Sequence, residues 1–107
     1  MSTKGIRLSE YDIKAIKVTF QNHFLKEDNL WLFGSRADLT KKGGDIDLYL
    51  ETKIDDSKIA FDKKNKFLID LKDLIGDQKI DVVLNLLKNN FKLPIYVKAK
   101  KVGIKII

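Results

Sequence analysis

The segment from Asp45 to Glu51 alternates strictly between apolar and polar side chains, and this pattern constrains the fold more than any other in the chain. Ile46, Leu48 and Leu50 fall on one side, which is the period of two that a β-strand imposes. The other side carries Asp45, Asp47, Tyr49 and Glu51. We therefore predict a strand with one face toward the core and one face available for function.

Two further strands are indicated by apolar runs. Leu30–Phe33 is apolar throughout and ends at Gly34, as is typical of a strand buried on both faces. We expect this strand to be central. A third strand is predicted from Ile80 to Leu84, with Asp81 opposite the core-facing side chains.

Helices are predicted where the apolar spacing changes from two to between three and four. Ser9 followed by Asp12 resembles a capping box, which marks the start of a helix. Apolar residues then recur at helical spacing, at Ile13, Ile16, Phe20 and Phe24. This indicates a first amphipathic helix.

A second helix is predicted to begin with Ser57 as its cap and to end at Gly76. Its stripe comprises Ala60, Lys64, Phe67, Leu68, Leu71, Leu74 and Ile75. A short last helix fits between Pro94 and Gly103, because proline suits the first helical turn and glycine the end. The apolar tail at 104–107 is left either as a final packed strand or as a partner contact.

The chain has 107 residues and 44% hydrophobic content, which suits one compact core. We predict a single domain over 1–107 of the α/β (α+β) class, with a small mixed sheet backed by helices. There is no cysteine, no secretory signal pattern at the start, and no apolar run near the roughly 20 residues that span a bilayer. These features favour a cytoplasmic protein without a membrane segment.

The net charge of +6 raises the possibility of nucleic-acid binding, since clustered cations release counterions from phosphates. However, Arg7 and Arg36 are the two arginines, and the remaining basic residues are lysines. Acidic residues are interleaved with them, at Asp55, Asp56, Asp62, Asp70, Asp73 and Asp77. A solvated mixed surface is therefore the preferred interpretation, and direct nucleic-acid binding is the least favoured function.

The segment 34–50, GSRADLTKKGGDIDLYL, carries the chemistry. Gly34 permits a sharp turn and close approach of a ligand, because it lacks a Cβ. Ser35 and the amides after it are expected at the start of a short helix, where unpaired N–H groups attract phosphate. Lys41 and Lys42 follow in the loop, either near phosphate or merely solvated.

Three aspartates are the candidate metal ligands. Asp45 and Asp47 leave the same face of one strand, about 7 Å apart along the backbone. Asp81 on a neighbouring strand would join them. Adjacent carboxylates repel one another unless a divalent cation compensates their charge, and paired magnesium ions lie roughly 3.5–4 Å apart in phosphoryl-transfer sites. The sequence therefore predicts a magnesium site.

The chain resembles the minimal nucleotidyltransferase (MNT) family of the DNA polymerase beta superfamily. The resemblance rests on GSRADLTKKGGDIDL, on the later KIDVVL and on the closing LPIYVKAKKVGIKI, in the order seen in that family, and covers nearly the whole chain. Members often serve as antitoxins beside HEPN-domain toxins. The resemblance implies a polymerase beta-like nucleotidyltransferase fold with two magnesium ions and ATP as substrate.

The resemblance also implies roles for individual residues. Gly34 and Ser35 would bind the triphosphate. Arg36 would steady phosphate or the loop. Asp45 and Asp47 would coordinate both metal ions, while Asp81 would ligate one ion and help to activate the acceptor hydroxyl.

Two departures from the family pattern affect the loop between these motifs. Gly44 stands where many relatives carry serine, and Asp38 with Leu39 stands where many carry Arg-Gly. Neither change removes a metal ligand, although Asp38 would weaken phosphate binding nearby. His23 is assigned no role, and Tyr49 is expected to pack or to border the nucleotide.

The expected function is transfer of NMP, with AMP expected, from an NTP to a hydroxyl. The resemblance implies a tyrosine of a HEPN toxin as acceptor, so that adenylylation would silence the toxin. The first alternative is an antitoxin that masks its partner by binding without catalysis. A small nucleic-acid-binding module is a distant third.

Overall fold

The structure is a computed structural model that describes residues 8–37 and 45–107. It confirms the predicted class, because three α-helices pack on a four-stranded mixed sheet. The elements in chain order are α1 (Glu10–His23), β1 (Asn29–Phe33), η1 (Gly34–Ala37), β2 (Ile46–Thr52), α2 (Ser57–Ile75), β3 (Ile80–Leu86), η2 (Leu87–Asn89), α3 (Pro94–Val102) and β4 (Ile104–Lys105).

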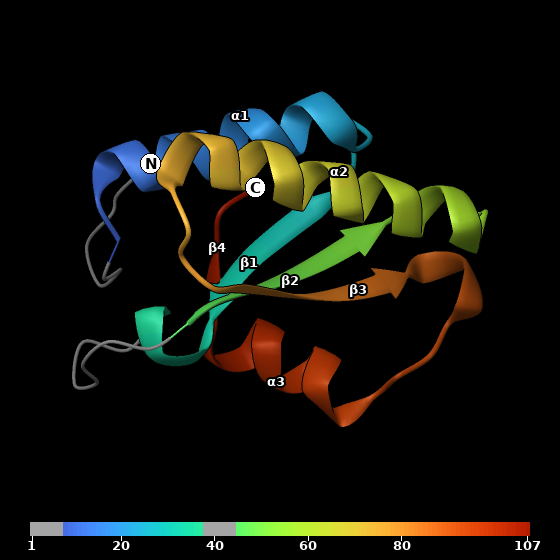
Figure 1. The fold of residues 1–107 in the computed structure, drawn as a ribbon. Helices are drawn as coiled ribbons and strands as arrows, with labels where there is room; N and C mark the ends of the chain where they lie inside the picture. The colour runs from blue at the N-terminus through green and yellow to red at the C-terminus, as the bar shows by residue number, and fades with distance from the viewer. Residues whose placement is uncertain (1–7, 38–44) are drawn as a thin grey trace.

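The strands follow the order β3-β2-β1-β4. β1 pairs antiparallel with β2 and β4, whereas β2 and β3 run parallel and are joined by α2. The sheet is therefore mixed, and β1 lies between two strands as predicted. α1 and α2 cover one face, and α3 lies against the other (Figure 1). This arrangement is compatible with a small α+β nucleotidyltransferase-like fold.

The larger core lies between the sheet and the α1–α2 layer. The even-numbered strand residues supply it from the sheet, among them Leu30, Leu48 and Ile80. From the helices, Phe20 stacks on Phe24 with ring centroids 5.1 Å apart, and Phe67 meets both edge-on at 6.1 Å. The predicted stripes of both helices therefore converge on one aromatic cluster.

A smaller core lies under α3, on the face that was predicted to be free for function. Trp31, Tyr49 and Ala99 are buried there, with Tyr96 packed against them. Tyr49 is fully buried and Glu51 is nearly so. The prediction of an open face is thus wrong for the second half of β2, because α3 lies across it.

Most helix ends agree with the sequence. The Ser9 side chain accepts a hydrogen bond from the Asp12 N–H (3.0 Å), Gly76 ends α2 with φ of 85°, and α3 ends at its cap Gly103. The start of α2 differs: Asp56, rather than Ser57, accepts from the first free N–H groups. Carboxylate and hydroxyl caps are close in strength, so sequence alone did not separate these neighbours.

The predicted α2 stripe is correct in its middle and wrong at one position. Ala60, Phe67 and Leu71 are buried, and Leu68 packs against the core. Leu74 is 46% exposed, although its carbonyl accepts a hydrogen bond from the Tyr11 hydroxyl near the start of α1. Leu74 therefore belongs to the apolar stripe in the sequence but is not part of the core.

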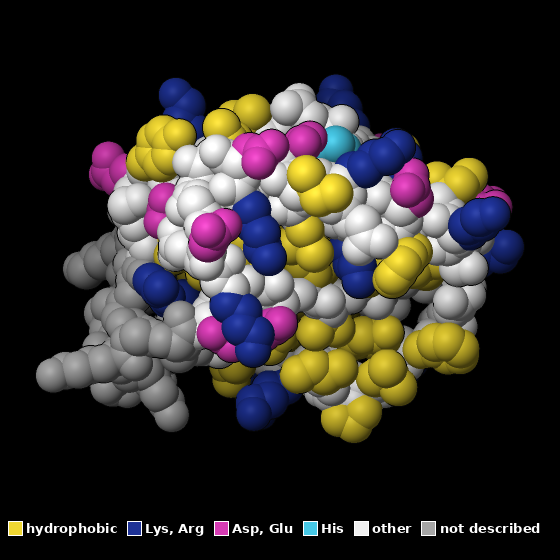
Figure 2. Space-filling model, viewed as in Figure 1, with side chains coloured by type: hydrophobic (Ala, Val, Ile, Leu, Met, Phe, Trp, Pro, Cys, Tyr) yellow, Lys and Arg dark blue, Asp and Glu magenta, His cyan; other side chains and the backbone are white. Residues whose placement is uncertain are grey.

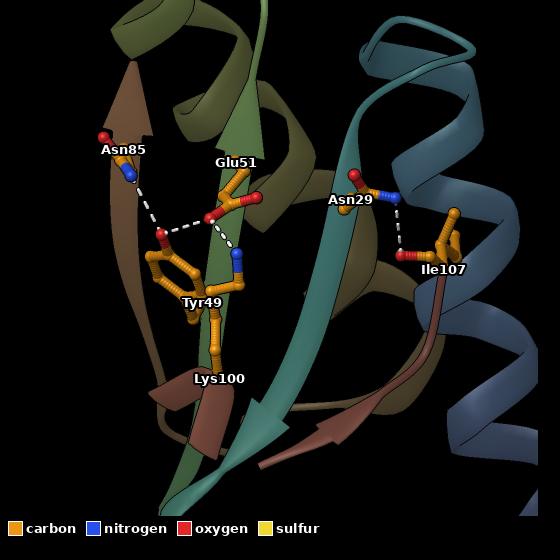
Figure 3. Close-up of polar contacts among 6 residues, drawn as sticks. All are labelled: Asn29, Tyr49, Glu51, Asn85, Lys100 and Ile107. Carbon is orange, nitrogen blue, oxygen red and sulfur yellow. Dashed lines mark hydrogen bonds and ion pairs between the residues drawn. The ribbon is translucent and has the colours of Figure 1, made fainter. Parts of the chain in front are cut away.

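The C-terminal tail is a packed strand. β4 pairs with β1, the Ile106 N–H donates to the Leu30 carbonyl (2.8 Å), and the Leu30 N–H donates to the Ile107 carbonyl (3.0 Å). The Asn29 amide adds a bond of 3.2 Å to the same Ile107 carbonyl (Figure 3). This decides between the two alternatives for the tail: most of its polar backbone and Ile106 are used within the domain.

Asp28 joins the α1–β1 turn to the end of β2. Its buried carboxylate accepts from the Leu25 N–H (3.0 Å), the Thr52 hydroxyl (2.6 Å) and the Lys53 N–H (2.8 Å). Such a group is stable in the interior because its oxygens are satisfied. None of the helices in the described ranges is both long and apolar enough to cross a membrane.

Candidate functional site

The candidate site lies where β2 and β3 begin. Asp47 and Asp81 are direct partners in the parallel pairing of these strands. Both fall on the α3 side of the sheet, since they alternate with core residues that face α1 and α2. Asp47 is partly buried and Asp81 is exposed. The fold therefore brings together two predicted carboxylates that lie far apart in the sequence.

Gly34 is fitted against Asp47. It follows β1 directly, has φ of 74°, and begins the short helical turn η1. A Cβ added to this glycine would collide with the Asp47 carboxylate. The glycine is thus required twice, for a backbone conformation that other residues rarely adopt and for close approach of a charged side chain. The predicted turn after the first strand is confirmed.

Asp45 lies just before β2 and is partly exposed. Its carboxylate is 3.4 Å from the Lys79 ammonium, which lies just before β3. The adjacent backbone is tied by a bond from the Ile46 N–H to the Lys79 carbonyl (3.0 Å). Lys79 therefore lies beside Asp45 at the edge of the site. No role was predicted for it from the sequence.

The electrostatics of the site centre on Asp47. Burial raises the pKa of Asp47, the charges of Asp81 and Asp45 raise it further, and Lys79 partly opposes them. The local charge therefore favours any species that brings positive charge to these carboxylates. This is the behaviour expected of a site for a divalent cation, whose preferred ligands are carboxylate oxygens.

The carboxylates are neighbours and not a closed coordination shell. Within residues 8–37 and 45–107, no three acidic or histidine side chains are gathered closely enough to hold a metal ion as they stand. The donor type and the sign of the field fit magnesium. The Asp45 side chain is engaged with Lys79 at the surface.

The remaining predicted site residues lie in or after η1. Arg36 is half-buried on this turn. The Ser35 backbone belongs to η1, while the placement of its side chain lies outside what the structure describes. The loop residues Asp38, Leu39, Lys41, Lys42 and Gly44 also lie outside the described residues.

A buried polar network under α3 was missed by sequence reasoning. The Tyr49 hydroxyl donates to Glu51 (2.8 Å) and accepts from the Asn85 amide (2.9 Å), and Lys100 lies 3.2 Å from the same Glu51 carboxylate (Figure 3). Burial raises the pKa of Tyr49 well above its usual range. Its hydroxyl is enclosed by these partners, so Tyr49 is a packing residue and does not border a nucleotide. The alternation of 45–51 showed that this strand has a polar face, but it could not show that a later helix covers that face.

His23 lies away from the site, at the end of α1. Its Nε2 is 2.6 Å from the Asp70 carboxylate on α2, and it lines a shallow depression between these helices. His23 belongs to the α1–α2 layer, whereas Asp47 and Asp81 point to the other side of the sheet. This agrees with the sequence analysis, which gave His23 no catalytic role.

Comparison with known proteins adds no family to this picture. No protein-family profile matches the chain, and no curated protein matches it either.

Proposed function

We propose that the protein is a magnesium-dependent nucleotidyltransferase that moves NMP, with AMP expected, from an NTP to a hydroxyl acceptor. The observation that carries the proposal is the pairing of Asp47 with Asp81 across β2 and β3, with the Gly34 turn held against Asp47. A glycine turn beside clustered carboxylates offers what triphosphate transfer needs: backbone close to phosphate and ligands for its metal.

The roles of individual residues follow from donor chemistry and from the resemblance to MNT proteins. Asp45, Asp47 and Asp81 would hold magnesium, and Asp81, the most exposed of them, would help to activate the acceptor. Bound magnesium would neutralise negative charge on the triphosphate as pyrophosphate leaves. The amides of η1 would bind phosphate, with Arg36 beside them.

The acceptor is proposed to be a protein. The MNT resemblance implies a tyrosine on a HEPN toxin, whose modification would silence it, so the chain would act as the antitoxin of a toxin–antitoxin pair.

A masking antitoxin is the second candidate, because the structure exposes apolar side chains that a binding protein would use. They gather on η2 and α3 and in the segment between them, and include Leu87, Phe91, Leu93 and Ile95. Such a protein would silence its partner by contact, without using the aspartates. A nucleic-acid module stays third, since it gives no purpose to the paired carboxylates.

The deciding experiment follows transfer of α-phosphate label from ATP, with magnesium, to proteins that co-purify with the chain. Wild type is compared with Asp45→Ala/Asp47→Ala and with a matched control, Asp62→Ala/Asp73→Ala, which removes the same charge from exposed positions on α2. We expect wild type and control to label the partner and the site variant to lose labelling.

The alternatives give different results. If no NTP labels the partner while the site variant still binds and neutralises it, masking by contact replaces catalysis. If the chain instead binds nucleic acid with a steep salt dependence that ignores the aspartates, the third function is favoured.

A further inference from the structure

The net positive charge of the chain arises from its C-terminal end. The 26 residues after Asp81 contain six lysines and no acidic residue, so they carry the whole net charge of +6. This corrects the view that acidic residues are interleaved throughout, because the interleaving stops at Asp81. In the described residues, Lys88, Lys92, Lys98 and Lys101 are exposed and have no carboxylate partner.

The same region exposes a group of large apolar side chains. Leu87 lies on η2, Phe91 and Leu93 on the segment that leads into α3, and Ile95 in its first turn; all four are exposed. Figure 2 shows hydrophobic side chains gathered over α3 and the segment before it. A contiguous apolar patch of this kind on a domain surface is typical of an interaction site.

An open sheet edge runs into this patch. β3 is an outer strand of the sheet, and no strand of the described residues pairs with its far side. Residues 82–86 of β3 are Val-Val-Leu-Asn-Leu, without the lysine or proline that usually protects an exposed edge. Its outward N–H and C=O groups are thus available to a strand of another protein.

We propose that the outer edge of β3 together with Leu87, Phe91, Leu93 and Ile95, here called the β3–α3 surface, docks an extended acidic segment of a partner protein. The segment would add a strand to β3, place apolar side chains on the patch and pair Asp or Glu residues with the surrounding lysines.

Other occupants fit this surface less well. Contact between the patches of two copies would bring two lysine-rich regions together, which like-charge repulsion opposes. Antiparallel pairing of two β3 edges would set Leu87 of one copy near Asp81 of the other and leave both patches uncovered. Neither a lipid surface nor a nucleic acid supplies a strand for the β3 backbone, and a base stacked on Phe91 would leave this edge unpaired.

The proposal deepens the proposed function, and the identity of the partner as the acceptor rests on that function. β3 begins beside Asp81 and ends at the patch, so a segment docked along β3 leads from the β3–α3 surface to the candidate site. The docking itself rests on exposure, charge and strand pairing, and is independent of catalysis.

The test is a backbone amide NMR titration of the whole chain with two synthetic peptides. One alternates valine and leucine with glutamate, and the other replaces each glutamate by lysine. We expect the glutamate peptide to shift the amides of residues 82–95, with binding that weakens as salt is raised. The lysine peptide should leave these amides unshifted.

Matched variants locate the contact. Phe91→Ser/Leu93→Ser should weaken binding of the glutamate peptide by roughly tenfold or more, as loss of central apolar contacts does. Phe61→Ser/Ile59→Ser alters side chains of similar exposure on α2, 55% and 49% against 60% and 46%, and should leave binding unchanged. Because all four positions are exposed, each variant should keep the wild-type fold, and its amide spectrum should match that of wild type away from the substituted residues.

Several results would overturn the proposal. These are equal binding of both peptides, shifts confined to other amides, or full binding by Phe91→Ser/Leu93→Ser. Self-association lost in that variant would assign the surface to a second copy. Stronger shifts with phosphatidylserine vesicles or with a single-stranded oligonucleotide would assign it to those ligands.

The outcome can be separated from that of the proposed function. Asp45→Ala/Asp47→Ala should bind the glutamate peptide like wild type, because neither aspartate belongs to the β3–α3 surface. Peptide binding without label transfer to any partner would overturn catalysis and keep the docking surface. Label transfer that is unaffected by Phe91→Ser/Leu93→Ser would keep catalysis and overturn docking of the acceptor protein on the β3–α3 surface.

Discussion

Asp47 and Asp81 occupy paired positions on two parallel strands, so that their side chains leave the same face of the sheet side by side. Between them they concentrate negative charge at one end of the sheet, and the pKa of Asp47 rises through burial and through the charges of Asp81 and Asp45. An arrangement that costs stability without a cation is typical of a functional site and not of a site selected for folding.

Replacing Asp47 by Asn should therefore stabilise the metal-free protein at neutral pH. A carboxyl whose pKa is raised in the fold favours folding when protonated, and this contribution is lost as pH rises through the folded pKa. Asparagine avoids that loss. In chelator, thermal unfolding should show a higher Tm for Asp47→Asn than for wild type. Added magnesium should raise the Tm of wild type by more than it raises the Tm of Asp47→Asn.

The exposed Asp62→Asn serves as control, and its Tm in chelator should match that of wild type, because its partner Lys66 forms a solvated surface pair. Magnesium should raise the Tm of this control as much as that of wild type, because the three site aspartates are intact. A Tm for Asp47→Asn below that of metal-free wild type would contradict the electrostatic account of the site.

Gly34→Ala should destabilise the fold and disturb the site together. Its φ of 74° disfavours alanine, and the new Cβ would push the Asp47 carboxylate away. Gly76→Ala separates the two effects, since φ there is 85° but the space around it is open. We expect about 1–3 kcal/mol of lost unfolding free energy for Gly76→Ala and more for Gly34→Ala.

Urea unfolding gives both values, and nucleotide transfer gives the second readout. Gly76→Ala should retain transfer in proportion to its folded fraction, whereas Gly34→Ala should lose it in the folded protein. Equal losses of stability, with transfer retained in both variants, would remove the proposed contact between Gly34 and Asp47.

Asp28→Ala should be among the most destabilising single changes. It leaves the buried Thr52 hydroxyl and the partly buried N–H groups of Leu25 and Lys53 without their acceptor. We expect a loss of about 3 kcal/mol or more in unfolding free energy. Asp56→Ala, which removes the α2 cap at an exposed position, should cost about 1 kcal/mol. Similar costs for both variants would show that burial of Asp28 adds little.

The sequence predicted those parts of the fold that depend on local chemistry. The alternation of 45–51, the glycine at position 76 and the Pro94 start of α3 each act within a few residues, so they can be recognised without the rest of the chain. The pairing of Asp47 with Asp81 was predicted in kind, although the parallel register that sets it depends on the α2 crossover.

The burial of Tyr49 and Glu51 could not be predicted in this way. Alternation shows that a strand has two different faces, but not which later element covers the polar one. α3 supplies Ala99 above Tyr49 and Lys100 beside Glu51 only after the chain has returned from β3. Asp28 was missed for a related reason, since two of its three donors, Thr52 and Lys53, lie 24 and 25 residues further along the chain, at the end of β2.

Tyr49→Phe tests this buried network and its dependence on pH. The change removes the hydroxyl that donates to Glu51 and accepts from Asn85, and should lower the unfolding free energy by about 1–2 kcal/mol at neutral pH. Burial raises the pKa of Tyr49, so its phenol stays neutral in the fold while the unfolded chain ionises above about pH 10. The stabilising contribution of Tyr49 is therefore present below this pH and is lost as pH rises further.

The stability advantage of wild type over Tyr49→Phe should consequently shrink above about pH 10, by up to about 1.4 kcal/mol per pH unit. Denaturant unfolding of both proteins between neutral and strongly alkaline pH measures it, with Tyr11→Phe as control. The Tyr11 hydroxyl donates to the Leu74 carbonyl at the surface, so its loss should change stability by less than about 0.5 kcal/mol at every pH. Parallel stability curves for wild type and Tyr49→Phe would show that the buried phenol ionises as easily in the fold as in the unfolded chain.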